Sequence, residues 1–133
     1  MSEWFLPSFG VNPNFLVTNG LSSGAYLSSH LHFVHSASIK GSGITIGGSY
    51  MSGEKIFEAG ALPYTDAAKD SNKAKIKEMF DAAKIKVDGF AAKSEIDSLT
   101  NMKDAPMIVE MGDKDKICRP LMKEWHDLWC AAV

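Results

Sequence analysis

The segment Gly20-Leu21-Ser22-Ser23-Gly24 constrains the fold of this chain more than any other part of its sequence. It follows an apolar, strand-like run, Phe15-Leu16-Val17-Thr18, and precedes a stretch from Ala25 to His35 that can form a helix. Glycines on both sides of the serine allow the backbone to turn sharply without Cβ clashes. The sequence therefore predicts a tight strand-to-helix turn that exposes the hydroxyl of Ser22.

This G-x-S-x-G pattern, placed between a strand and a helix, is typical of the nucleophile elbow of α/β-hydrolases. Ser22 is the candidate nucleophile. The amide of Ser23 would lie at the helix N-terminus, where it could bind an oxyanion. The alternative is a Gly/Ser-rich turn of an α/β domain without a catalytic role.

Bulk properties restrict the domain organisation and the partners. We expect residues 1–133 to form one domain, short for an α/β-hydrolase and therefore incomplete. The formal net charge of −2 and the absence of a long apolar run favour neither nucleic acid nor a membrane as a partner. The lysines between Lys69 and Lys86 alternate with acids, which indicates a solvated helix face. The first seven residues do not resemble a signal peptide.

Hydrophobic periodicity predicts an α/β order of elements. Strands are expected at Phe15–Thr18, Gly43–Gly47 and Pro106–Met111, and helices at Ala25–His35, Ala67–Lys84, Ser94–Asn101 and Pro120–Trp129, with Lys86–Phe90 irregular. The fold class is thus α/β, a partial α/β-hydrolase fold with about three mainly parallel strands and flanking helices. We expect helices on both sheet faces, and uncovered strand edges that favour self-association.

A second motif follows the last expected strand, Gly112-Asp113-Lys114-Asp115. In α/β-hydrolases the acid of the catalytic triad follows the nucleophile in the chain. Asp115 is the candidate triad acid, and Asp113 is the alternative. An ordinary Asp/Gly turn would give the same pattern.

No histidine of this chain is predicted to act as the catalytic base. The base should follow the acid, and only His126 does so, in a helix between Trp125 and Asp127 where we interpret it as a surface or edge residue. His32 and His35 are spaced so that they could share a metal, but no third ligand is evident, so we expect solvated or partly buried helix histidines. We therefore expect no metal and no other cofactor.

Three segments of this sequence resemble the catalytic domain of poly(3-hydroxybutyrate) depolymerases. Val11–Tyr26 is similar to the start of that domain, including its G-L-S-S/A-G elbow. Gly41–Tyr50 is similar to its G-x-G-V-x-A-G-G-P-Y segment, with Ser49 in place of proline and no cysteine after the tyrosine. Ile96–Met102, Met107–Met111 and the G-x-x-D turn ending at Asp115 resemble its I-D-x-x-x-N-L, strand, G-x-x-D block.

The resemblance implies a secreted or lumenal serine esterase that cleaves 3-hydroxyacyl polyesters or related short esters. It implies Ser22 as the nucleophile, the Ser23 amide as an oxyanion donor and Asp115 as the triad acid. The histidine and the second oxyanion donor of the family have no counterpart here. A non-catalytic half-domain that acts by binding, or a gene fragment, is therefore the alternative function.

Overall fold

A three-stranded parallel sheet forms one layer of the computed structural model, which describes residues 9–52, 70–112, 114–115 and 119–133. The strands are β1 (Leu16–Leu21), β2 (Ile39–Thr45) and β3 (Met107–Glu110), and β2 lies between the other two. Residues 16 to 21 of β1 pair with β2, and Ser42 to Thr45 pair with β3. The expected parallel α/β sheet with flanking helices is therefore confirmed.

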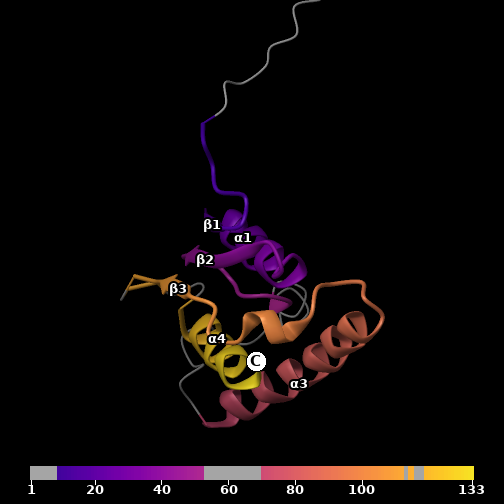
Figure 1. Cartoon of the computed structure of the whole chain (residues 1–133). Helices are drawn as coiled ribbons and strands as arrows, with labels where there is room; N and C mark the ends of the chain where they lie inside the picture. Colours follow the sequence, from indigo (N-terminus) through magenta and orange to yellow (C-terminus); the bar gives the residue numbers. More distant parts are fainter. Residues whose placement is uncertain (1–8, 53–69, 113, 116–118) are drawn as a thin grey trace, which may run out of the picture.

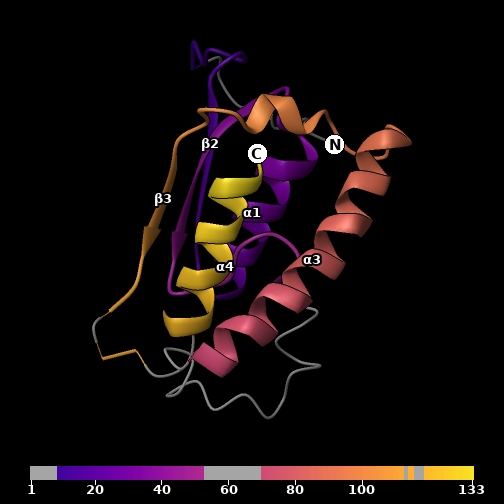
Figure 2. The same ribbon diagram turned by 90° about the horizontal axis from the view of Figure 1, so that it is seen from below.

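Three α-helices lie on one side of this sheet (Figures 1 and 2). Helix α1 (Ser23–Val34) packs directly on β1 and β2, and α4 (Arg119–Ala132) lies beside it. Helix α3 (Asp70–Ala92) packs against α4 and forms the layer farthest from the sheet. A short 3-10 helix, η2 (Leu99–Met102), precedes β3.

The hydrophobic core lies between the helices and the loop that follows β2. Trp125 and Trp129 of α4 are fully buried, and both indole nitrogens donate hydrogen bonds to the carbonyl oxygen of Tyr50, at 2.9 and 3.0 Å. The Tyr50 ring in turn stacks on Phe33 of α1. The core comprises Phe33, Tyr50, Ile76, Phe80, Ala83, Val87, Met102, Met122, Trp125 and Trp129.

Several expected element boundaries are wrong. Strand β2 begins at Ile39 rather than Gly43, because Ile39 and Gly41 pair with Leu16 and Val17 of β1. Helix α3 continues through 86–90, the stretch expected to be irregular, because Val87 is fully buried on the core side of the helix. The short helix expected at 94–101 is only the 3-10 turn η2. The expected helix start at 67 and its cap at 66 lie outside the described residues.

The outer face of the sheet is not covered by any described element, so the expectation of helices on both faces is wrong for this part of the chain. Val17 and Leu21 of β1 and Ile108 of β3 are 63, 62 and 71 % exposed. A shallow groove of about 260 Å³ runs across this face, with Gly41 and Gly43 of β2 on its floor. No helix in the described ranges is long and apolar enough to cross a bilayer.

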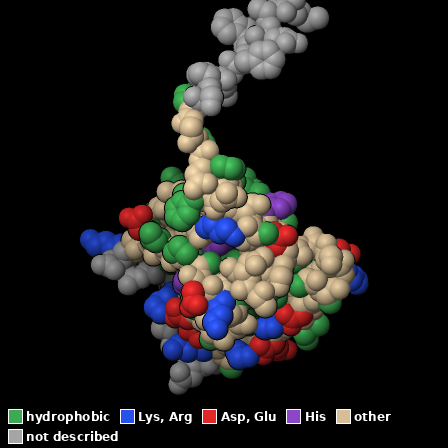
Figure 3. All heavy atoms as spheres, viewed as in Figure 1, with side chains coloured by type: hydrophobic (Ala, Val, Ile, Leu, Met, Phe, Trp, Pro, Cys, Tyr) green, Lys and Arg blue, Asp and Glu red, His purple; other side chains and the backbone are tan. Residues whose placement is uncertain are grey.

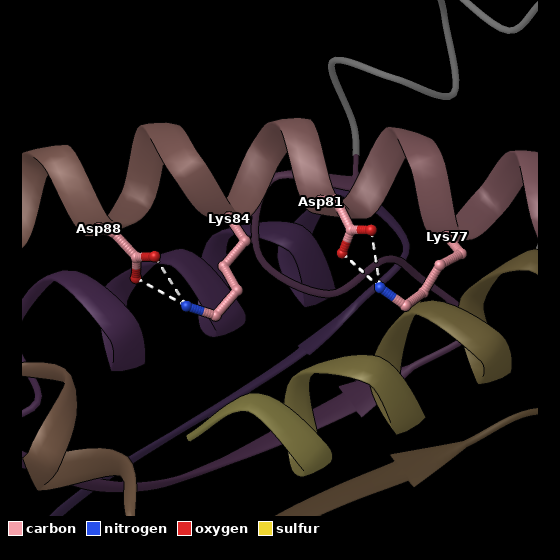
Figure 4. A network of polar contacts seen from close by, with 4 residues as sticks. All are labelled: Lys77, Asp81, Lys84 and Asp88. Atoms are coloured by element: carbon pink, nitrogen blue, oxygen red, sulfur yellow. Dashed lines mark hydrogen bonds and ion pairs between the residues drawn. The ribbon is translucent and has the colours of Figure 1, made fainter.

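The lysine-rich segment of the sequence forms an exposed face of α3. Lys77 pairs with Asp81 and Lys84 with Asp88, at N–O distances of 2.6 and 2.7 Å (Figure 4). Each exposed pair one helical turn apart stabilises a helix by a few tenths of a kcal/mol. Over the part of the surface formed by α3 and α4, acidic and basic side chains are interspersed (Figure 3).

Candidate active site

Ser22 lies at the junction of β1 and α1, in the sharp turn that the sequence predicts. Its backbone has φ 55° and ψ −118°, a conformation that L residues rarely adopt. Its N–H donates to the carbonyl of Thr45 at 3.0 Å, and its own carbonyl accepts the N–H groups of Ala25 and Tyr26 at 3.0 and 3.3 Å. Three backbone hydrogen bonds therefore hold this residue in a strained conformation, which costs on the order of 1–3 kcal/mol.

The turn depends on the glycine two residues before Ser22. A Cβ atom at Gly20 would lie only 2.0 Å from the carbonyl oxygen of Gly24, a backbone atom that cannot move aside. No larger residue fits there unless helix and strand separate. An added Cβ atom at Gly24 would meet nothing within 4 Å. A glycine is therefore less strictly required at position 24 than the sequence motif suggests.

The side chain of Ser22 does not cap helix α1. Ser22 is the N-cap residue of α1, yet its side chain makes no capping hydrogen bond, and the residue is exposed. The first amides of a helix have no intrahelical acceptors and carry the positive end of its dipole. The Ser23 amide, the first of α1, therefore lies next to the hydroxyl with the polarity that an oxyanion requires.

Asp115 follows β3 at the same edge of the sheet as Ser22. Leu21, Thr45 and Glu110, the last residues of the three strands, are aligned across the sheet, because all strands run parallel. The N–H of Asp115 donates to the carbonyl of Gly112 at 3.0 Å, which closes the expected turn, and the residue is half-buried. Asp113, the alternative acid, lies outside the described residues.

Strand β2 separates the serine strand from the aspartate strand. Neighbouring strands are about 4.8 Å apart, so β1 and β3 are separated by about 10 Å. The structure thus places Ser22 directly after β1 and Asp115 beyond the end of β3, at the same edge of the sheet.

The three histidines of α1 are engaged elsewhere. His30 Nδ1 lies 2.7 Å from the carbonyl oxygen of Tyr26, and its ring contacts Tyr50 edge-on. His32 is fully buried, with Nδ1 2.9 Å from the Ser42 hydroxyl. His35 is exposed at the C-terminal end of the helix, about 20 Å along the axis from Ser22.

Burial disfavours the charged form of His32. Desolvation, with a smaller contribution from the charge of Lys40, lowers the pKa of His32 below 6.5. The expectation of a solvated or partly buried residue is therefore wrong for His32. No cluster of three metal-ligating side chains occurs within the described ranges.

His126, the one histidine after Asp115 in the sequence, is half-buried on α4. Its Nε2 lies 3.4 Å from the sulfur of Cys130, and burial lowers its pKa. The residue lines a pocket of about 330 Å³ with Val109, Met111, Lys123 and Asp127. Among the described residues, this lining contains none from the elbow, so His126 is placed against β3 and not beside Ser22.

Sequence reasoning missed the contribution of the loop that follows β2. The sequence Gly47-Gly48-Ser49-Tyr50 predicts only a turn after the second expected strand. In the structure this loop contacts the elbow: a Cβ atom at Gly47 would lie 2.6 Å from the carbonyl oxygen of Ser22. The adjacent glycines 47 and 48 are the one sequence signal that could have indicated such a close approach.

No protein-family model, curated protein or solved structure matches this chain.

Proposed function

We propose that this protein is a serine carboxylic-ester hydrolase in which Ser22 attacks an ester carbonyl and forms an acyl-enzyme. The observation that carries the proposal is the backbone of Ser22, at φ 55° and ψ −118° between β1 and α1. Strained non-glycine residues of this kind persist where the surrounding structure enforces them, which is often at reactive sites. An exposed hydroxyl and the N-terminus of α1 complete the arrangement.

The chemistry at this edge is that of acyl transfer. The hydroxyl oxygen of Ser22 bonds to the acyl carbon, the alcohol leaves with a proton, and water releases the acid from the serine. The Ser23 amide stabilises the charge that develops on the carbonyl oxygen. Asp115 would orient and stabilise a protonated imidazole placed beside Ser22.

The proposed substrates are 3-hydroxyacyl polyesters and their short oligoesters. This substrate class rests on the resemblance of the elbow, of Gly41–Tyr50 and of the Asp115 block to poly(3-hydroxybutyrate) depolymerases. The exposed position of Ser22 is compatible with a polymeric substrate, because a polymer chain can reach an open sheet edge more readily than a deep cavity.

The described residues place no general base beside Ser22. Loss of triad members costs several orders of magnitude in rate, while oxyanion stabilisation and binding keep some residual catalysis. We therefore expect slow hydrolysis by this chain in a buffer that cannot act as a base.

Chemical rescue by imidazole tests the proposal. Hydrolysis of a chromogenic 3-hydroxybutyrate ester is measured with and without added imidazole, for the unaltered chain and for Ser22→Ala. The rate difference between the two proteins should grow as the concentration of imidazole rises, because a free imidazole can reach the exposed serine and deprotonate it. The Ser22→Ala protein corrects for direct hydrolysis by imidazole. Equal rates for both proteins at every concentration would contradict the proposal.

A domain that acts by binding is the second candidate function. The uncovered outer face of the sheet favours it, because parallel sheets are normally covered on both faces. In this case Ser22→Ala leaves hydrolysis unchanged, and the chain binds a 3-hydroxybutyrate oligomer or a protein partner without turnover. Isothermal titration with a soluble oligomer, next to the rescue experiment, separates the two functions.

A further inference from the structure

The loop after β2, residues 46–52, carries unusual backbone strain for a surface turn. Ile46 has φ 47° and Met51 has φ 61°, and neither is a glycine. For a β-branched residue such as isoleucine, a positive φ is a genuine outlier. With Ser22, three of the five non-glycine residues of positive φ in the described chain therefore lie in the elbow and in this loop.

The strained loop touches the elbow at Gly47. A Cβ atom there would lie 2.4 Å from the Cβ of Ala25 and 2.6 Å from the carbonyl oxygen of Ser22, both far below contact distance. Gly47 has no positive φ, so its backbone conformation does not require a glycine. Position 47 requires a glycine only because Ser22 and Ala25 of the elbow lie so close to it.

The loop cannot move away from the elbow without breaking other contacts. One residue further, a Cβ atom at Gly48 would lie 2.1 Å from the ring of Tyr26. Two residues beyond that, the carbonyl of Tyr50 accepts both indole N–H groups of α4, and its ring stacks on Phe33 with the centroids 4.7 Å apart. The core therefore fixes the distance between the loop and Ser22.

We propose that Gly47 is a positioning residue for Ser22. Its missing side chain lets the loop support the carbonyl of Ser22, and this support holds the residue at φ 55° with its hydroxyl exposed. The inference deepens the proposed function and rests on it for the reactivity of Ser22. A side chain at position 47 pushes the Ser22 peptide away and moves the hydroxyl from the Ser23 amide.

The first experiment measures the reactivity of Ser22 directly. An alkyl fluorophosphonate ester forms a bond from the Ser22 oxygen to phosphorus while fluoride leaves and the proton passes to the buffer, and intact-protein mass spectrometry follows the adduct. Gly47→Ala should react roughly tenfold more slowly or worse, because small displacements of a reacting group have large effects on rate. The matched control is Gly89→Ala in α3, where an added Cβ atom meets nothing within 4 Å. An unchanged labelling rate in folded Gly47→Ala would overturn the inference.

A stability cycle tests the same contact without relying on reactivity. Urea midpoints are measured for the unaltered chain, Gly47→Ala, Ser22→Gly and the double variant. A glycine at 22 can leave the strained conformation and move its carbonyl, so Gly47→Ala should lower the midpoint by about half as much or less in that background. Additive shifts overturn the inference, as does a Gly47→Ala protein that fails to fold with either residue at 22.

The two experiments separate the two proposals. If the unaltered chain is not labelled at Ser22 but the stability cycle is non-additive, the proposed function fails and the positioning role stands. If the chain is labelled at Ser22 but the cycle is additive, only the positioning role fails.

Discussion

At the scale of single residues, Ser22 is the position where this chain departs most from ordinary backbone geometry. Its positive φ is imposed by three backbone hydrogen bonds and by the close approach of Gly20 to Gly24. A structural turn at this place could use glycine at no conformational cost. A serine there is therefore better explained by its hydroxyl than by the turn.

Replacement of Ser22 by glycine should stabilise the protein. Relief of the strained backbone contributes on the order of 1–3 kcal/mol, which outweighs the entropic cost of a glycine, roughly 0.5–1 kcal/mol. Ser22→Ala keeps the Cβ atom and should leave the free energy of unfolding nearly unchanged. Urea unfolding followed by circular dichroism compares the two. Equal stabilities of the glycine and alanine variants would show that Ser22 is not strained.

The sequence motif predicted this residue because a G-x-S-x-G segment between strand and helix has few ways to fold. The turn, the exposed hydroxyl and the position of Asp115 at the same sheet edge all follow from local patterns. The support from Gly47 could not be predicted, because it arises from the packing of a loop 25 residues away in the chain. Two adjacent glycines in a sequence can indicate a close backbone contact, but they do not identify the segment that makes it.

At the scale of elements, the interface between α1 and the sheet is unusually polar. Ser28 bonds to Thr18 at 2.9 Å, and His32 bonds to Ser42. The helix therefore carries a weak amphipathic signal, which explains why its buried histidine was not anticipated. Helix α3 differs from the expectation in another way. The sequence pattern predicts that it ends at Lys84, whereas the buried Val87 and the pair Lys84–Asp88 belong to its continuation.

Histidines whose pKa is lowered by burial should make the fold sensitive to acid. The folded-state pKa of His32 is lowered from 6.5 by burial, so its contribution to stability is present above pH 6.5 and is lost as the pH falls through the folded pKa. The free energy of unfolding should decrease between pH 7.5 and 5.5, by up to about 1.4 kcal/mol per pH unit for each such histidine. His126, whose pKa burial also lowers, adds to this slope.

The variant His32→Asn tests this prediction. The asparagine amide can still bond to Ser42 but does not titrate, so the variant should be less stable at pH 7.5 and should lose less stability on acidification. His35→Asn, at an exposed position of the same helix, is the matched control and should keep the slope of the unaltered chain. A slope that His32→Asn leaves unchanged would assign the acid sensitivity to other groups.

At the scale of the whole molecule, the sheet has helices on one side only within the described residues. Strands β1 and β3 also have an unpaired edge each in the sheet that these residues form. The sequence correctly predicted three parallel strands separated by helices along the chain. It could not predict which face the helices cover, since β-strands with glycines at alternate positions, such as β2, carry little facial pattern.

Exposed apolar area on the sheet should cause concentration-dependent self-association. Ile108→Lys introduces a charge on the outer face and should shift the sedimentation profile toward the monomer. Ile85→Lys on α3 is the matched control, because Ile85 and Ile108 are 73 and 71 % exposed. Association that persists in Ile108→Lys, or that Ile85→Lys reduces equally, would contradict a role of the sheet face.

The most direct test of Ser22 as a nucleophile is to trap its acyl-enzyme. A chain without a positioned base should release the acyl group slowly, so an activated 3-hydroxybutyrate ester should leave one acyl group on the protein. Intact mass and peptide mapping locate it. We predict a single 3-hydroxybutyryl adduct on Ser22, absent from Ser22→Ala and strongly reduced after denaturation of the protein before exposure. An adduct spread over lysines, equal amounts on the folded and denatured chains, or no adduct at all would contradict the assignment of Ser22 as the nucleophile.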